Sequence, residues 1–97
     1  MKHEFLEFEW DSNKAFRNVH KHKVTFREAT MVFNDVLAIT YYDDAHSHRE
    51  QRFATIGMSD QGRVLVVSHT VVGGNIRLIS ARKATPRERK IYEKEGK

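Results

Sequence analysis

The sequence predicts an α+β fold: an antiparallel sheet of about four strands with two N-terminal helices and one C-terminal helix, in the order β-α-α-β-β-β-α. Three observations support this prediction. Apolar residues recur at helical spacing in the first third of the chain, and helix-capping residues gather near residue 85. Between them lie β-branched runs joined by short polar or glycine-containing turns, which connect antiparallel neighbours.

The first third of the chain predicts one strand and two helices. Phe5–Trp10 ends in an alternation of apolar and acidic residues, which is typical of a strand. Asp11 follows as a helix N-cap, and we expect this helix to run to about Lys21. A second helix starts at Thr25, which forms a capping-box pattern with Glu28.

The rest of the chain predicts the remaining strands and the last helix. The expected strands are Leu37–Tyr42, Glu50–Met58, Arg63–Val72 and Asn75–Ala81. Their connections are a polar loop, a turn and a tight hairpin turn, at Asp43–His48, Ser59–Gly62 and Gly73-Gly74. The last helix begins with three agreeing signals: Thr85 as N-cap, Pro86 at the first helical position and Glu88 completing a capping box.

Length and composition narrow the class of protein. The 97 residues are enough for a single domain, residues 1–97, with one hydrophobic core. The chain has no cysteine, which excludes a disulfide framework and a thiolate metal site. No segment is apolar enough for a signal peptide or a membrane span, so we expect a cytoplasmic protein that does not bind a membrane.

Charge is unevenly distributed along the chain. Residues 1–60 contain 8 Lys and Arg against 10 Asp and Glu, whereas residues 61–97 contain 9 against 3. This asymmetry indicates an anionic partner, such as nucleic acid, for the C-terminal part. The alternative is a solvated basic helix.

Three arginines flank or interrupt the last two predicted strands. A two-residue Gly73-Gly74 turn would place Leu65 opposite Arg82. Arg63 would then share one face and one end of the sheet with Arg82, and Arg77 would lie on the other face. Two guanidinium forks suit a phosphodiester, and in RNA cleavage the substrate's own 2′-hydroxyl can attack phosphorus without a metal. Alternatively, these arginines protect the sheet edge or pair with nearby acids.

Candidate proton-transfer groups each have a second interpretation. Glu50 and Arg52 share a strand face, as a base with its orienting partner or as a surface ion pair. His22 at the end of the first helix could shuttle protons or interact with the helix dipole. Tyr92 in the last helix could donate to a phosphate, stack on a base, or pack against the sheet.

Two histidine pairs have the spacing of metal ligands. His20 and His22 lie on different faces of a helix and make a poor chelate. His46 and His48 lie in a loop beside two aspartates, which leaves a weak metal site open. We expect neither a catalytic metal nor any other cofactor.

Several short strings follow one another along nearly the whole chain, and their order and spacing match the pattern of a known family. They include Phe8-Glu9-Trp10-Asp11, Lys21-His22, Val24-Thr25-Phe26, Glu50 with Arg52, Gly62-Arg63-Val64-Leu65, Ile79-Ser80-Ala81-Arg82-Lys83-Ala84, Glu88-Arg89 and Tyr92. Together they resemble the BrnT family of type II toxins. Lys23 departs from the pattern, because family members often have glycine there, and we expect it to change that turn.

The resemblance implies a RelE-like fold and a toxin that cleaves messenger RNA without a metal, inhibiting translation and growth. It also implies a BrnA-like antitoxin encoded by the adjacent gene, and operator DNA bound only through the antitoxin complex. The alternative function is a non-catalytic nucleic-acid-binding module that uses the basic C-terminal part.

The resemblance also assigns residues to roles. Arg63 and Arg82 fit catalysis best, followed by Arg77 and Tyr92, with Glu50, Arg52 and His22 as further catalytic candidates. The expected RNA-binding residues are Lys21, Lys83, Arg87 and Arg89.

Overall fold

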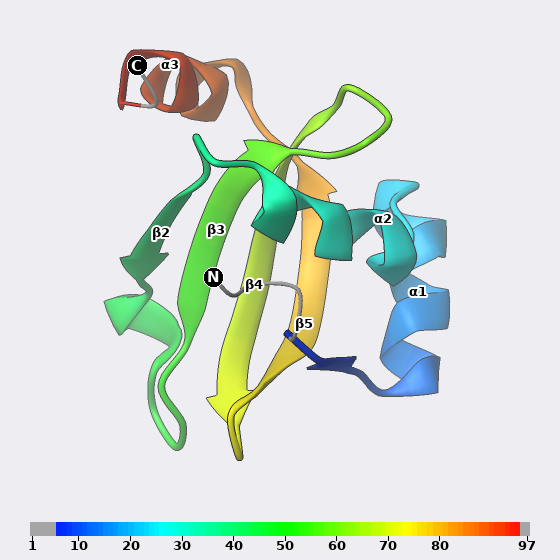
Figure 1. Ribbon diagram of the computed structural model, residues 1–97. Helices are drawn as coiled ribbons and strands as arrows, with labels where there is room; N and C mark the ends of the chain where they lie inside the picture. Colours follow the sequence, from blue (N-terminus) through cyan, green and yellow to red (C-terminus); the bar gives the residue numbers. More distant parts are fainter. Residues whose placement is uncertain (1–5, 96–97) are drawn as a thin grey trace.

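The computed structural model describes residues 6–95, which form a five-stranded sheet with helices at both ends of the chain (Figure 1). The strands are β1 (Phe8–Glu9), β2 (Ile39–Tyr42), β3 (Phe53–Met58), β4 (Val64–Val72) and β5 (Asn75–Lys83). The α-helices are α1 (Ser12–His22), α2 (Phe26–Thr30) and α3 (Pro86–Glu95). Two 3₁₀ turns, η2 (Met31–Asn34) and η3 (Asp44–His46), precede and follow β2. The predicted α+β fold class is confirmed.

The order of strands across the sheet is β1-β5-β4-β3-β2. Strands β2 to β5 are antiparallel neighbours, as their short connections predict. These are the four antiparallel strands that the sequence predicts, and β1 is a fifth strand that pairs parallel to β5, with Phe8 opposite Ile76. The expected order of elements is therefore one strand short before α3. Two helices and most of the sheet separate β1 from β5 in sequence, so no turn signal reports their pairing. Of the strand expected at Phe5–Trp10, Phe5 lies outside the described residues.

The first helices begin where the sequence places their caps. The Asp11 carboxylate accepts hydrogen bonds from the backbone of Asn13 and Lys14, and the Thr25 hydroxyl accepts one from Glu28. Helix α1 ends with Lys23 in the left-handed conformation, φ 61° and ψ 33°. Lysine therefore adopts here the backbone geometry that usually favours glycine at a helix C-terminus.

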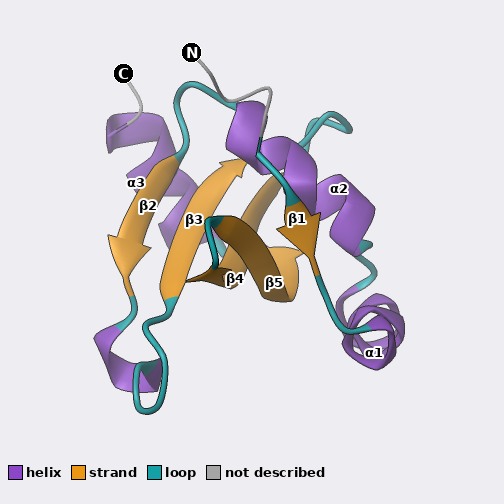
Figure 2. Ribbon diagram, turned by 60° about the horizontal axis from the view of Figure 1, so that its bottom comes forward, coloured by secondary structure: helices purple, strands orange, loops and turns teal. Residues whose placement is uncertain are grey.

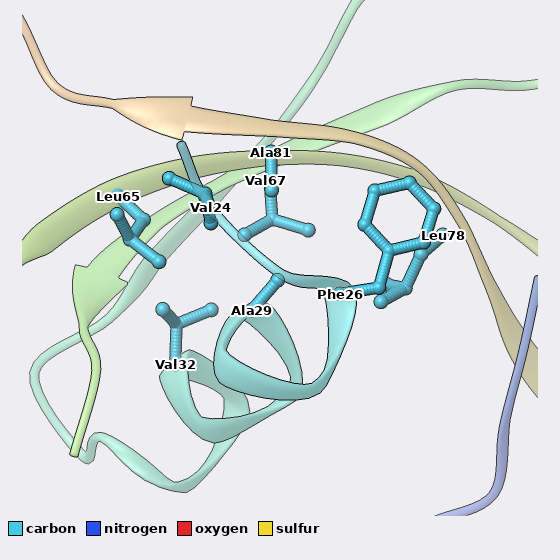
Figure 3. Close-up of a cluster of buried hydrophobic side chains, with 8 residues drawn as sticks. All are labelled: Val24, Phe26, Ala29, Val32, Leu65, Val67, Leu78 and Ala81. Carbon is cyan, nitrogen blue, oxygen red and sulfur yellow. The ribbon is translucent and has the colours of Figure 1, made fainter. Parts of the chain in front are cut away.

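One face of the sheet, which we call the covered face, packs against α2 and η2. Figure 3 shows the buried side chains of this layer, in which Ala29 and Val32 of the helical turns face Leu65, Val67 and Ala81 of the sheet, and Val24, Phe26 and Leu78 complete the cluster. Helix α1 lies along the edge of β5, where the buried Asn18 amide binds the backbone. Its Nδ2 donates to the carbonyls of Val24 and Ala81, and its Oδ1 accepts from the Ala81 amide. The chain thereby satisfies an otherwise open stretch of sheet edge.

The opposite face, which we call the open face, is covered only in part, by α3. Ala84 and Tyr92 pack there against Ala54, Ile56 and Val66. Figure 2 shows α3 on the side of β2, with α1 and α2 on the side of β1 and β5. The Tyr92 hydroxyl donates to Asp35 Oδ2 at 2.6 Å, which ties α3 to the segment before β2. The rest of this face stays accessible.

A β-bulge in β5 changes the expected register. The hairpin begins as predicted, with Val72 opposite Asn75. Leu78 then stands opposite His69 but Ser80 opposite Ser68, so Ile79 is an extra residue in β5. The predicted pairing of Leu65 with Arg82 is therefore wrong.

The bulge moves Arg82 to the other face of the sheet and leaves Arg77 where the hairpin register places it. Arg82 stands opposite Val66, on the open face, and Arg77 opposite Thr70, on the same face. Arg63 points to the covered face, toward α2. The structure thus separates Arg63 from Arg82 and unites Arg82 with Arg77, the reverse of the expected arrangement.

Candidate functional site

A groove of about 350 Å³ crosses the open face. Strands β2 to β5 and the loop at η3 supply its lining residues, which are Tyr41, Asp43, His46, Arg52, Ala54, Val66, Ser68, Ile79, Ser80 and Arg82. Its lining combines three apolar side chains with hydroxyl, imidazole, guanidinium and carboxylate groups. Guanidinium donors beside aromatic and apolar surface suit an RNA chain.

Arg82 is held at one side of the groove by the first turn of α3. Its Nη1 and Nη2 donate to Oε1 and Oε2 of Glu88 at 2.7 and 2.9 Å. The hydrogen bond from Arg82 lowers the pKa of Glu88 to about 2, and the same contact raises the pKa of Arg82. Glu88 also completes the predicted capping box with Thr85, so the carboxylate that orients the guanidinium is itself fixed. The Arg82 side chain remains 40% exposed, which leaves donors for a ligand.

A second cationic cluster lies where β3 begins. The Glu50 carboxylate contacts Arg77 Nη2 at 2.5 Å and Arg52 Nε at 3.4 Å. The predicted neighbours Glu50 and Arg52 do meet, and Arg77 joins them from β5. Two guanidinium groups share one carboxylate here, so the cluster keeps a positive charge beside the groove. Arg52 belongs to both this cluster and the groove lining.

Arg63 is committed to a structural ion pair. Its Nε donates to Glu28 Oε2 at 2.9 Å, its Nη2 contacts Glu28 Oε1, and Nη2 also donates to the Lys23 carbonyl at 3.2 Å. The Glu28 side chain is only 2% exposed and accepts a further hydrogen bond from Ser59. The hydrogen bond from Arg63 lowers the pKa of Glu28. The expectation that Arg63 converges with Arg82 on a phosphate is wrong. The guanidinium of Arg63 lies on the covered face, where it is bound by the buried carboxylate of Glu28.

His22 and Tyr92 lie outside the lining of the groove. His22 is half-buried at the end of α1, and burial, together with the charges of Lys21 and Arg82, lowers its pKa. Burial and the hydrogen bond to Asp35 raise the pKa of Tyr92 to about 12. With its hydroxyl donated to Asp35, Tyr92 anchors α3.

The four expected RNA-binding residues are exposed: Lys21, Lys83, Arg87 and Arg89. Arg87 also lines a shallow hollow of about 450 Å³ on α3 with Lys90 and Lys94. These three residues follow helical spacing, so they form one basic stripe that begins one residue before Glu88.

Sequence reasoning missed His46 as a groove residue. Its Nδ1 lies 2.9 Å from Asp43 Oδ2, and both side chains line the groove. The available signal was the polar loop that contains both residues, which spacing alone presented as a weak metal site. Among residues 6–95, no group of three or more His, Cys, Asp or Glu side chains could hold a metal ion. Within the same range, no helix is both long and apolar enough to cross a membrane.

Comparisons with known proteins agree on one family. A family model described as "Ribonuclease toxin, BrnT, of type II toxin-antitoxin system" matches residues 10–88. The fold is similar to the crystal structure of the Brucella abortus ribonuclease toxin BrnT, with a TM-score of 0.65 and 27% identity. That similarity covers 82% of this chain and 97% of the other. A comparison with curated protein sequences gives no match.

Proposed function

The chain belongs to the BrnT family of ribonuclease toxins of type II toxin–antitoxin systems, and we propose that it is a metal-independent endoribonuclease acting on messenger RNA. Cleavage inhibits translation and growth, and the protein works in the cytoplasm. The groove on the open face is the RNA site. The observation that carries this assignment is the convergence of Arg52 and Arg82 on one accessible groove of the sheet.

The proposed chemistry uses the RNA's own 2′-hydroxyl as nucleophile. Attack on phosphorus develops negative charge on the phosphate oxygens, and preorganised guanidinium donors stabilise that charge more than the ground state. Arg82 is the better preorganised of the two, because both oxygens of Glu88 orient it. Arg77 extends the cationic surface through Glu50, and the stripe on α3 binds RNA beyond the groove.

The family implies a cognate antitoxin. We propose that it is BrnA-like, that the adjacent gene encodes it, and that it covers the basic surface with an acidic or amphipathic segment. Operator DNA is bound only through that complex. Co-expression with the adjacent gene should yield a stable complex and restore growth.

Arg82→Ala provides the direct test of the RNA site. Loss of one preorganised donor is expected to lower single-turnover RNA cleavage by ~10²–10³-fold. The melting temperature should fall by no more than about 4–8 °C, because the pair that is lost is partly exposed and such pairs contribute about 0–1 kcal/mol. Arg82→Lys should restore activity only in part, since an ammonium cannot reproduce the fork.

The matched control is Lys94→Ala at the far end of the basic stripe. It should weaken RNA affinity slightly and reduce its salt dependence without changing the cleavage step. Each assay is run with and without a chelator. RNA binding without cleavage by the wild-type protein would favour a non-catalytic nucleic-acid-binding module. Cleavage that disappears with the chelator would contradict the metal-independent reaction.

A further inference from the structure

We propose that His46 is the general base of RNA cleavage in the groove and that Asp43 positions it. This inference rests on the proposed function and deepens it, because the arginines supply charge but cannot exchange protons near neutral pH. Arginine-rich sites for transesterification still need a group that removes the proton of the 2′-hydroxyl. The groove contains one imidazole, and it carries the hydrogen bond to Asp43.

The loop that carries His46 is fastened to β3. The Asp43 amide donates to the Arg52 carbonyl at 2.8 Å, and the Ser47 hydroxyl donates to the Asp43 carbonyl at 2.6 Å. The Arg52 amide in turn donates to Ser47 Oγ at 2.9 Å. These bonds fix the backbone of the loop against the backbone of Arg52, the residue whose side chain also lines the groove.

The hydrogen bond to Asp43 assigns the imidazole tautomer. An ionised carboxylate can only accept, so the proton of a neutral His46 is on Nδ1 and its Nε2 carries a free lone pair. This is the arrangement by which a carboxylate orients a histidine base and stabilises the imidazolium that forms. The imidazole side chain is 68% exposed, so Nε2 is accessible to a nucleotide in the groove.

Cleavage by this route transfers one proton to His46. Nε2 of His46 takes the proton of the 2′-hydroxyl, the 2′-oxygen forms a bond to phosphorus, and the bond from phosphorus to the 5′-oxygen breaks. The 5′-oxygen takes a proton from water, leaving a 2′,3′-cyclic phosphate and a 5′-hydroxyl end. His46 returns its proton to solvent. Arg52 and Arg82 face the phosphate on which charge accumulates.

Four variants and two substrates test this role. His46→Ala and His46→Gln should each lower single-turnover cleavage by ~10²–10⁴-fold, the usual contribution of a general base, with unchanged melting temperatures. Asp43→Asn should also lower cleavage, by no more than the His46 variants do, because it disturbs the tautomer and the orientation of the His46 imidazole. His48→Ala is the matched control: it changes a histidine of the same loop that does not line the groove, and it should cleave like the wild type.

A modified RNA substrate distinguishes a general base from a general acid. An RNA with sulfur in place of the 5′-bridging oxygen has a leaving group that needs no proton, so it rescues only variants that lack a general acid. His46→Ala should not be rescued, and added imidazole should restore part of its activity. If the sulfur substrate restored cleavage by His46→Ala, or if His46→Ala cleaved ordinary RNA within about threefold of the wild-type rate, the proposal would be overturned. A wild-type protein that does not cleave RNA overturns the proposed function as well, whereas an active wild type with an active His46→Ala overturns only the role of the dyad.

Discussion

Replacing Arg63 by alanine is expected to destabilise the protein and to leave RNA cleavage per folded molecule nearly unchanged. The sequence alone predicts the opposite, a folded and inactive variant, because it places Arg63 beside Arg82. In the structure Arg63 neutralises Glu28, a residue of α2 whose side chain is only 2% exposed. Truncation would leave this carboxylate buried and unpaired.

The expected magnitude follows from that burial. Removing one partner of a buried ion pair costs roughly 3–5 kcal/mol of unfolding free energy. Arg63 itself is 30% exposed, and Ser59 keeps its hydrogen bond to Glu28, so water and a hydroxyl offset part of the cost. We therefore expect a loss of about 2–3 kcal/mol, which is roughly 10–20 °C in Tm for a domain of this size.

Thermal and urea denaturation followed by circular dichroism measure this effect. A second substitution, Glu28→Gln, should recover part of the loss in the Arg63→Ala background, because it removes the uncompensated charge. In the wild-type background the same substitution should destabilise. An Arg63→Ala protein that melts near the wild-type temperature but has lost cleavage would refute the structural role and return Arg63 to the reaction.

Three further predictions concern single contacts. Tyr92→Phe should cost about 1–3 kcal/mol, because Asp35 loses a hydrogen bond, and should leave cleavage unchanged; an inactive but stable variant would contradict the anchoring role of Tyr92. The pKa of Glu88 falls from 4.5 to about 2 through Arg82, so its contribution to stability is complete above pH 4.5 and is lost as the pH falls toward 2. Melting temperatures should therefore fall less over that range in Glu88→Gln than in wild type, and equal slopes would contradict the pairing. Asn18→Ala should lower the free energy of unfolding by about 3 kcal/mol or more in urea titrations, because it leaves buried backbone groups of β5 without partners; a loss below about 1 kcal/mol would show that water replaces the amide.

The sequence predicts a cationic candidate site but not its membership. Arginines of the last two strands and the basic C-terminal part indicate a phosphate ligand, which stays a prediction, and of those strand arginines Arg82 lines the groove, together with Arg52 from the start of β3. Which arginines converge could not be predicted, because side chains alternate between faces and one extra residue reverses the assignment. Ile79 is that residue, and nothing in its identity marks a bulge. His46 was missed for a related reason, since its relation to Arg82 arises only when β2 to β5 assemble.

The sequence by itself determined the features that depend on neighbours within about four residues. The caps at Asp11, Thr25 and Thr85 and the Gly73-Gly74 turn all lie where local hydrogen bonding and backbone freedom require them. Only the tertiary structure decided the parallel pairing of β1 with β5 and the burial of Glu28 against a residue 35 positions away. It also decided the face on which Arg82 lies. These depend on contacts between distant segments, whose free energy is set by the whole packed sheet and not by any local pattern.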